Sequence, residues 1–247
     1  MNRESAGERV SVVVGDSIVE IMVGSGRRRN ALRAADWDLL TGHFDAVSRL
    51  PAVRAVVVRG AEDTFCAGSD ITEWIDAEPR AVDDSFERME QAFRAVERCP
   101  VPVIAQVQGV AAGAGCQLAL ACDLRVMADS ARIGMPIARL GILPSPAFAA
   151  RLVHLAGPAL ARELLYTGRL LSAREAAAAG LANAVVPDAD VTEHVAGLLA
   201  RIADQPAVAV RAAKRAVTEA TGELPQRSLG PAASYGDLQS GITRLIG

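Results

Sequence analysis

The chain has 247 residues, of which 51% are hydrophobic and only 4% aromatic, and its formal net charge is −3. This composition allows one large core filled mostly by alanine, valine and leucine, and the charge gives no reason to expect a nucleic-acid-binding protein. No apolar run reaches the length of a membrane span, and the polar start carries no secretory signal pattern. Four cysteines without metal-binding spacing predict reduced thiols, no metal site and a cytoplasmic location.

The first third of the chain predicts a hairpin, a helix and a buried strand. Val10–Val14 and Ile18–Val23 are apolar runs on either side of Gly15-Asp16, the pattern of a β-hairpin. Apolar residues then recur at helical spacing from about 34 to 50, which predicts an amphipathic helix. The run at 55–58 is apolar and Arg59 follows it, so we expect a buried strand over 55–59.

The elements further along the chain are expected in this order. Residues 75–84 are acid-rich and contain a proline, which predicts a mobile loop, and a helix should follow from Phe86 to Val96. Strands are expected at 103–107, 123–127, 131–134 and 184–186. Helices are expected at 113–121, near Pro146, at 158–167, from Ser172 to Gly180, at 191–203 and at 206–220. The loop 135–146 should be stiff because it holds three prolines, and weak periodicity in 222–247 supports no assignment.

The stretch Val103–Met127 is the most informative part of the sequence. It predicts a strand, then a turn with Gly109, Gly113 and Gly115, then a buried helix. The free N–H groups at the start of such a helix favour an oxyanion site. A dinucleotide-binding oxidoreductase is the alternative, but Leu118 stands where that fingerprint has a third glycine or an alanine. A turn that only packs a helix on a sheet is the other alternative.

A second glycine turn lies in the segment DTFCAGSDITEW, residues 63–74, directly after the predicted strand at 55–59. Two glycine turns that each follow an apolar strand can direct two backbone N–H groups at one carbonyl oxygen. Such a pair stabilises the enolate of a thioester. The two turns together therefore predict an oxyanion hole.

These motifs carry a family resemblance. The segments F-C-A-G-S-D-I and G-V-A-A-G-A-G-C-Q-L-A-L-A-C-D resemble the signature of the enoyl-CoA hydratase/isomerase, or crotonase, superfamily. Arg29-Asn-Ala-Leu32 and the segments 134–144 and 168–181 extend the resemblance, which runs to about Thr218. It implies an α/β fold, a spiral of β-β-α units over residues 1–190, with a C-terminal helical region at 191–247. That region implies a homotrimer, or a dimer of trimers.

The resemblance also implies the ligand and the residues that bind it. The partner would be an acyl-CoA thioester of fatty-acid metabolism, with no cofactor other than the coenzyme A of the substrate. The backbone N–H groups of Ser69 and Ala114 would form the oxyanion hole. The coenzyme A would lie along Ala67, Gly68, Asp70 and Ile71, with its phosphates near Arg29.

Two departures from the family pattern bear on the reaction. Gln117 and Ile137 stand where hydratases of the family have glutamates. A positioned acid or base is worth roughly 10² to 10⁴ in rate, so ordinary hydration is not expected of this chain. Two hypotheses follow: an enzyme, a lyase or isomerase by resemblance, that acts through a thioester enolate with an unidentified base, or a non-catalytic acyl-CoA binding or carrier protein.

Five further side chains have two interpretations each. Ser145 before Pro146 fits a helix N-cap better than a catalytic role. Cys66 fits packing behind its turn better than a nucleophile, because no histidine is near it in sequence. Arg139 could face the site or form a surface salt bridge, and Lys214-Arg215 could reach coenzyme A bound to a neighbouring subunit or lie on a solvated helix face.

Overall fold

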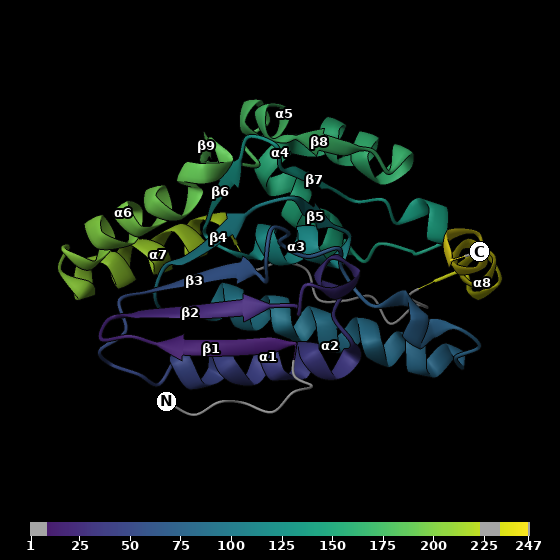
Figure 1. The fold of residues 1–247 in the computed structure, drawn as a ribbon, viewed down its shortest axis with the longest axis horizontal. Helices are drawn as coiled ribbons and strands as arrows, with labels where there is room; N and C mark the ends of the chain where they lie inside the picture. Colours follow the sequence, from purple (N-terminus) through teal and green to yellow (C-terminus); the bar gives the residue numbers. More distant parts are fainter. Residues whose placement is uncertain (1–8, 223–232, 247) are drawn as a thin grey trace.

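The structure is a computed structural model, and it describes residues 9–222 and 233–246. Its centre is a six-stranded sheet of order β1-β2-β3-β4-β6-β9, next to a three-stranded sheet of order β5-β7-β8 (Figure 1). The strands of the large sheet are β1 (Val10–Val14), β2 (Ile18–Val23), β3 (Ala55–Gly60), β4 (Val103–Val107), β6 (Leu124–Ala128) and β9 (Ala184–Val186). Those of the small sheet are β5 (Val110–Ala112), β7 (Arg132–Gly134) and β8 (Leu170–Ser172).

The helices occupy both faces of the large sheet and the two ends of the molecule. They are α1 (Ala34–Val47), α2 (Pro79–Arg98), α3 (Ala114–Ala121), α4 (Pro146–Thr167), α5 (Ala173–Ala178), α6 (Val191–Ala203), α7 (Ala207–Thr221) and α8 (Tyr235–Ile246). Short 3-10 turns are η1 (Arg27–Asn30), η2 (Ile71–Trp74), η3 (Ala138–Leu140) and η4 (Asp188–Asp190). In Figure 1, α6 and α7 lie at one end of the molecule and α8 at the other.

The predicted hairpin is confirmed, and it starts the large sheet. β1 and β2 are antiparallel, and the Gly15 N–H donates to the Ile18 carbonyl at 2.9 Å in the turn. From β2 onward, all neighbouring strands of this sheet are parallel. Parallel neighbours need long crossover connections, and α1 and α2 supply the first two of them.

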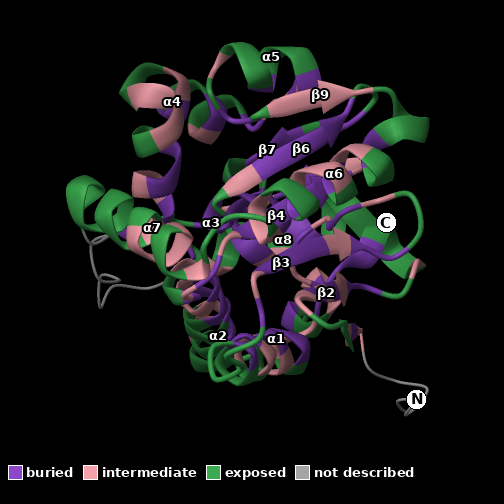
Figure 2. Ribbon diagram, turned by 90° about the vertical axis from the view of Figure 1, so that its left-hand side faces the viewer, coloured by how far each residue is buried: buried purple, intermediate pink, exposed green. Residues whose placement is uncertain are grey.

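Alternate residues of the buried strands enter two different cores. Val56 and Val58 of β3 belong to the larger core, which includes Trp37 of α1 and Phe93 of α2. The rings of these two aromatic residues meet edge to face, with centroids 5.5 Å apart. Val57 instead packs in a smaller core against α6. The central strands are therefore buried on both faces, as Figure 2 shows.

Three sequence predictions need correction. Residues 79–84 are not a loop, because α2 begins at Pro79, whose fixed φ and missing N–H suit the first turn of a helix. The helices predicted near Pro146 and at 158–167 are one element, α4, with non-helical angles only at Gly157 (φ 75°). The stretch between Gly109 and Gly113 is not only a turn, because Val110–Ala112 form β5, a strand of three residues that is too short to give an apolar pattern of its own.

Two predicted caps are confirmed, and the end of the chain holds an unassigned helix. Ser145 Oγ accepts a hydrogen bond from the Phe148 N–H at 3.2 Å, and Ser172 forms a capping box with Glu175. α8 lies in the stretch 222–247, of which residues 223–232 are outside the described ranges. Over residues 9–222 and 233–246, none of the helices has both the length and the apolar character needed to cross a membrane.

Candidate active site

The two predicted glycine turns lie against each other. The Cys66 N–H donates to the Val110 carbonyl at 2.9 Å, and the Ala112 N–H donates to the Cys66 carbonyl at 3.0 Å. These backbone hydrogen bonds join the first turn, residues 66–69, to β5, which leads directly into α3. Segments more than 40 positions apart in sequence are therefore fixed relative to one another by main-chain atoms.

Two glycines permit this close approach. Gly68 has a φ of 105°, and a Cβ there would lie 2.9 Å from the Ala112 carbonyl oxygen and 3.1 Å from the Ala114 nitrogen. A Cβ on Gly115 would overlap the Cys66 carbonyl oxygen. Because neither overlap can be relieved by a side-chain rotation, the two turns can adjoin only where these residues are glycine.

Ser69 and Ala114 have free backbone N–H groups at this junction. Within residues 9–222 and 233–246, neither N–H donates to a protein acceptor. Ala114 is the first residue of α3, where N–H groups have no intrahelical partner and the helix dipole is positive. Free donors on adjoining turns are the arrangement that a developing oxyanion requires.

A cavity of about 70 Å³ opens beside these N–H groups. We call it the site cavity, and the largest side chains on its wall are Ile71, Trp74, Phe86, Met89, Ile137 and Phe148. The Ser69 hydroxyl also faces it and donates to the Met89 sulfur at 2.8 Å. The site cavity therefore combines free N–H donors with a wall that suits an apolar group.

Gln117 and Ile137 differ in their position relative to the site cavity. Ile137 is 5% exposed and lies on the wall of the site cavity. Gln117 is fully buried and does not line it. The Gln117 Nε2 donates to the Phe148 carbonyl at 3.0 Å, and its Oε1 accepts from Arg151 at 3.3 Å. Both polar atoms of the Gln117 amide are thus engaged by α4.

Arg151 is the centre of a buried ionic cluster that the sequence did not reveal. Its guanidinium donates to both oxygens of Glu90, at 3.0 and 2.8 Å, and to Glu97 at 2.6 Å. It also lies 5.2 Å from the centroid of the Phe93 ring. Burial by itself lowers the pKa of Arg151, but the two carboxylates more than offset this and raise it. The one available signal was that Glu90 and Glu97 each follow an apolar position of the same predicted helix.

The arginine-rich turn η1 is attached to the first glycine turn. Arg28, Arg29 and Asn30 all have positive φ, between 48° and 59°, which residues other than glycine rarely adopt. The buried Asn30 amide holds this conformation by donating to the Ala61 carbonyl at 2.7 Å and accepting from the Gly26 N–H at 2.8 Å. The Arg29 carbonyl accepts from the N–H of Ala67 at 2.9 Å, and the Arg29 side chain is exposed.

Asp70 is held by two arginines. Its carboxylate accepts from Arg9 at 3.0 Å and from Arg28 at 2.8 Å, and the residue is 5% exposed. Burial by itself raises the pKa of Asp70, but hydrogen bonds from Thr72 and the two arginines outweigh it and lower that pKa. Asp70 therefore stays ionised and connects the first turn to η1.

The remaining candidate residues lie away from the site cavity or serve packing. Ser145 caps α4 and does not line the cavity. The four cysteines are free and buried, and burial raises the pKa of the Cys66 thiol to about 12. Lys214 binds Asp123 of the same chain at 2.7 Å, and Arg139 is exposed and donates to the Gly168 carbonyl. No cluster of three or more His, Cys, Asp or Glu that could hold a metal occurs in the described ranges.

Comparison with known proteins gives a consistent result. The family profile "Enoyl-CoA hydratase/isomerase" matches residues 14–231. A crotonyl-CoA hydratase from Syntrophomonas wolfei subsp. wolfei is 36% identical over 196 residues, which are 78% of this chain and 75% of that protein.

Solved structures agree with this match. The enoyl-CoA hydratase from Bacillus anthracis gives a TM-score of 0.82 at 34% identity, over 85% of this chain and 82% of that one. An enoyl-CoA hydratase/isomerase family protein from Hyphomonas neptunium gives 0.85 at 29% identity, over 98% and 90%. The chain therefore belongs to the enoyl-CoA hydratase/isomerase family, and its two sheets and C-terminal helices form the crotonase fold.

Proposed function

We propose that this protein binds an acyl-CoA thioester and polarises the thioester carbonyl with the N–H groups of Ser69 and Ala114. The observation that carries the proposal is the pair of free N–H groups on adjoining turns at one end of the site cavity. Two fixed dipoles aimed at the carbonyl oxygen stabilise negative charge there, which makes the α-carbon more acidic. The activity named for the relative from Syntrophomonas wolfei, crotonyl-CoA hydratase, supports a substrate of this class.

The coenzyme A moiety would extend from the cavity towards η1. Ala67, Gly68 and Ile71 lie on the cavity wall and would flank the pantetheine arm. Arg29 is exposed beside Ala67 and would bind the phosphates. Asp70 would support this region through its ion pairs with Arg9 and Arg28 rather than by direct contact.

We propose further that the reaction is not hydration by a pair of glutamates. Gln117 and Ile137 would occupy the two glutamate positions. An amide cannot act as a general base near neutral pH, and both polar atoms of the Gln117 side chain are engaged by α4. Ile137 offers only hydrocarbon to the cavity. A protein that binds acyl-CoA without turnover is the second candidate, favoured by the apolar side chains of that wall.

The C-terminal helices support a proposal about assembly. No residue of α7 is buried within the described chain, and Val208 and Val217 are 77% and 64% exposed. A helix that buries no residue in the described single chain leaves its apolar side chains available for contact with another subunit. We therefore propose that residues 191–247 form the interface of a homotrimer or of a dimer of trimers, and that the protein is cytoplasmic. Analytical ultracentrifugation tests the oligomeric state.

One experiment separates these possibilities. Purified protein is titrated with butyryl-CoA by calorimetry and incubated with crotonyl-CoA while the enoyl absorbance is followed. We expect butyryl-CoA to bind and crotonyl-CoA to persist, and a Gln117→Glu, Ile137→Glu double variant to gain hydration. Absence of binding contradicts the proposal that the protein binds acyl-CoA. If the wild type hydrates crotonyl-CoA and Gln117→Ala abolishes this activity, the proposal that the protein does not catalyse ordinary hydration is wrong.

Isotope exchange distinguishes the enzyme from the binding protein. Butyryl-CoA is incubated with the protein in D₂O, and deuterium at the α-carbon is measured by mass spectrometry. Exchange above the rate in buffer shows that an enolate forms at the site. Binding without exchange indicates a carrier.

A further inference from the structure

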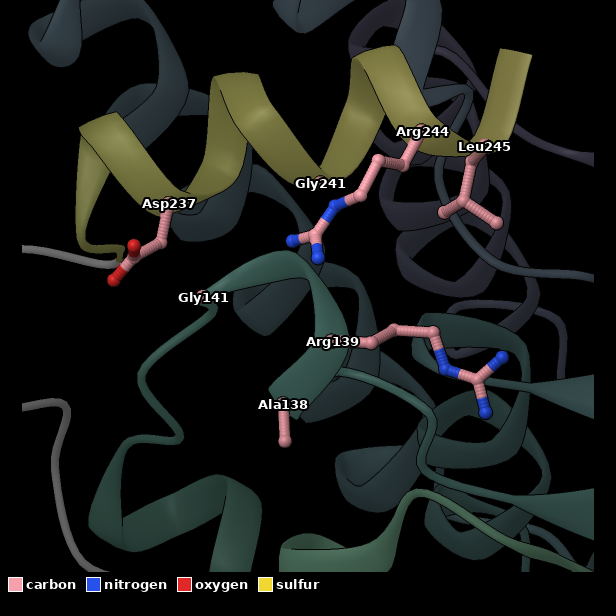
Figure 3. A pocket seen from close by; sticks show the side chains of 7 residues that line it. All are labelled: Ala138, Arg139, Gly141, Asp237, Gly241, Arg244 and Leu245. Atoms are coloured by element: carbon pink, nitrogen blue, oxygen red, sulfur yellow. The ribbon is translucent and has the colours of Figure 1, made fainter. Parts of the chain in front are cut away.

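The C-terminal helix α8 contacts both walls of the site cavity from outside. One wall is formed by η2 and the start of α2, and the other by η3 and the loop that follows it. Figure 3 shows α8 passing over η3, with Gly241 above the loop that contains Gly141. The groove seen there holds Arg139 and Arg244 and shares no lining residue with the site cavity.

On the first wall, α8 binds the backbone of Trp74. The Gln239 Nε2 donates to the Trp74 carbonyl at 2.7 Å, and its Oε1 accepts from the Asp76 N–H at 3.3 Å. One turn earlier in α8, the Tyr235 hydroxyl donates to Asp83 of α2 at 2.7 Å. The helix therefore fixes η2 relative to α2 at two points.

The side chain of Trp74 is held just as firmly. Its Nε1 donates to Ser85 Oγ at 3.3 Å, and its ring stacks on Phe86 with centroids 5.1 Å apart. Trp74 is 3% exposed, and both rings line the site cavity. The indole cannot leave the wall unless its contacts to Ser85 and Phe86 of α2 are broken, and Gln239 holds the backbone from which it extends.

On the second wall, two glycines bring α8 into close contact with η3. A Cβ on Gly241 would lie 2.8 Å from the Arg139 carbonyl oxygen, and one on Gly141 would lie 2.5 Å from the Asp237 Cβ. The Ser234 N–H also donates to the Gly141 carbonyl at 2.9 Å. Leu140 extends from η3 to the site cavity, so α8 fixes this wall as well.

The volume between the two walls indicates the size of the group that fits. The site cavity measures about 70 Å³. A cavity of about 150 Å³ holds the six carbons of benzene, so by proportion this one, which includes the position beside Ser69 and Ala114, holds about three carbons. A short acyl group of about three to four carbons, such as butyryl, is therefore the size that fits this space.

We infer that the protein selects short acyl chains of about four carbons, that Trp74 sets this limit, and that Gln239 and Gly241 of α8 are the residues that position the walls. This inference rests on the proposed function, because it names the acyl group of the same thioester. A longer chain would have to displace Trp74 together with the contacts that hold it. One extra methylene that does not fit costs about tenfold or more in affinity.

The test compares butyryl-CoA with octanoyl-CoA by calorimetry on the full chain. We expect wild type to bind butyryl-CoA at least about tenfold more tightly. Trp74→Ala should reverse or abolish this preference, and Gln239→Ala should narrow it about threefold or more while butyryl-CoA still binds. Thr243→Ala is the matched control, because its hydroxyl bonds only to the Gln239 carbonyl within α8 and its side chain is exposed. It should leave the preference unchanged.

The outcomes that overturn the inference differ from those that overturn the proposed function. Equal affinity of the wild type for both thioesters, or an unchanged preference in Trp74→Ala, contradicts the inference while acyl-CoA binding stands. Failure of the wild type to bind either thioester contradicts the proposed function. If thermal melting shows that Trp74→Ala does not fold, the preference of Gln239→Ala decides.

Discussion

The two ends of the site cavity are built from different parts of the chain. The end proposed to bind the thioester carbonyl, residues 66–69 with 112–115 and here called the carbonyl end, is made of main-chain atoms that hydrogen-bond to one another. The apolar end consists of side chains from separate elements, among them Trp74, Phe148 and Ile137. The first end has no side chain that could be exchanged to alter its donors, whereas the second is defined by side chains alone.

Because of this difference, substitutions can change the apolar side chains of the site while the backbone N–H donors stay in place. The N–H donors of Ser69 and Ala114 persist whatever side chains stand there, provided that Gly68 and Gly115 allow the turns to adjoin. At the apolar end, each substitution changes the volume or the chemistry of the cavity. We expect mutations at the two ends to differ in kind, and four predictions test this.

The largest effect is expected from Gly115→Ala, at the carbonyl end. The new methyl group would overlap the Cys66 carbonyl, and only a shift of backbone could relieve this. We expect a loss of about 4 kcal/mol or more in the free energy of unfolding, measured with urea. Gly42→Ala is the control, since its Cβ meets nothing within 4 Å in the middle of α1. A cost equal to that of the control would show that the junction of the turns is not rigid.

A smaller but still large loss of stability is expected from Arg151→Leu, which removes the contacts of α4 with α2 and α3 behind the site cavity. Arg151 joins α4 to Glu90 of α2 and to Gln117 of α3, and its loss leaves the buried Glu90 without the cation that binds both of its oxygens, although Arg94 remains 3.1 Å away. We expect a loss of about 3 kcal/mol in the free energy of unfolding.

Arg169→Leu is the matched control for Arg151→Leu. Arg169 also binds two glutamates, Glu163 and Glu175, but this cluster lies at the surface. Solvent screens exposed ion pairs, so the loss should be much smaller. Equal losses in the two variants would show that burial of the Arg151 cluster does not matter.

An intermediate effect is expected from Asp70→Asn, at the mouth of the site. The charged hydrogen bonds from Arg9 and Arg28 are weakened, which should cost about 1.5 kcal/mol at pH 7. Because the pKa of Asp70 is lowered in the folded state, its contribution is present above the ordinary carboxyl pKa of about 4 and is lost as pH falls through the folded value.

Urea unfolding of both proteins between pH 7 and pH 3 tests the sign of this effect. The stability difference between wild type and Asp70→Asn should be constant above about pH 5 and shrink below pH 4. A difference that grows as the pH falls would contradict the lowered pKa.

The smallest effect is expected from Ser145→Ala, near the apolar end. Loss of the cap on α4 should cost about 1 kcal/mol, with butyryl-CoA affinity unchanged. Ser172→Ala removes the cap of α5 and should cost a similar amount. If Ser145→Ala kept its stability and lost turnover or binding, Ser145 would be a catalytic residue and not a cap.

Local signals in the sequence determined much of the fold and the carbonyl end of the site. The hairpin, the helices α1, α6 and α7, the positions of the later strands of the large sheet and both caps follow from apolar spacing and capping residues, which act over a few positions. The two glycine turns were recognisable because each is a short contiguous motif. Where local composition misled, at 79–84, acidic residues suggested a loop although Pro79 begins α2.

Only the tertiary structure decided how the turns meet and what surrounds them. Gly115 lies against Cys66, Gln117 binds Arg151, and Trp74 is held by Gln239, across separations of 49, 34 and 165 positions. No local pattern predicts such contacts, because they arise when packed elements bring distant segments together. The sequence thus determined which residues form the two glycine turns. Packing decided that the Gln117 amide binds Phe148 and Arg151 and how large the site cavity is.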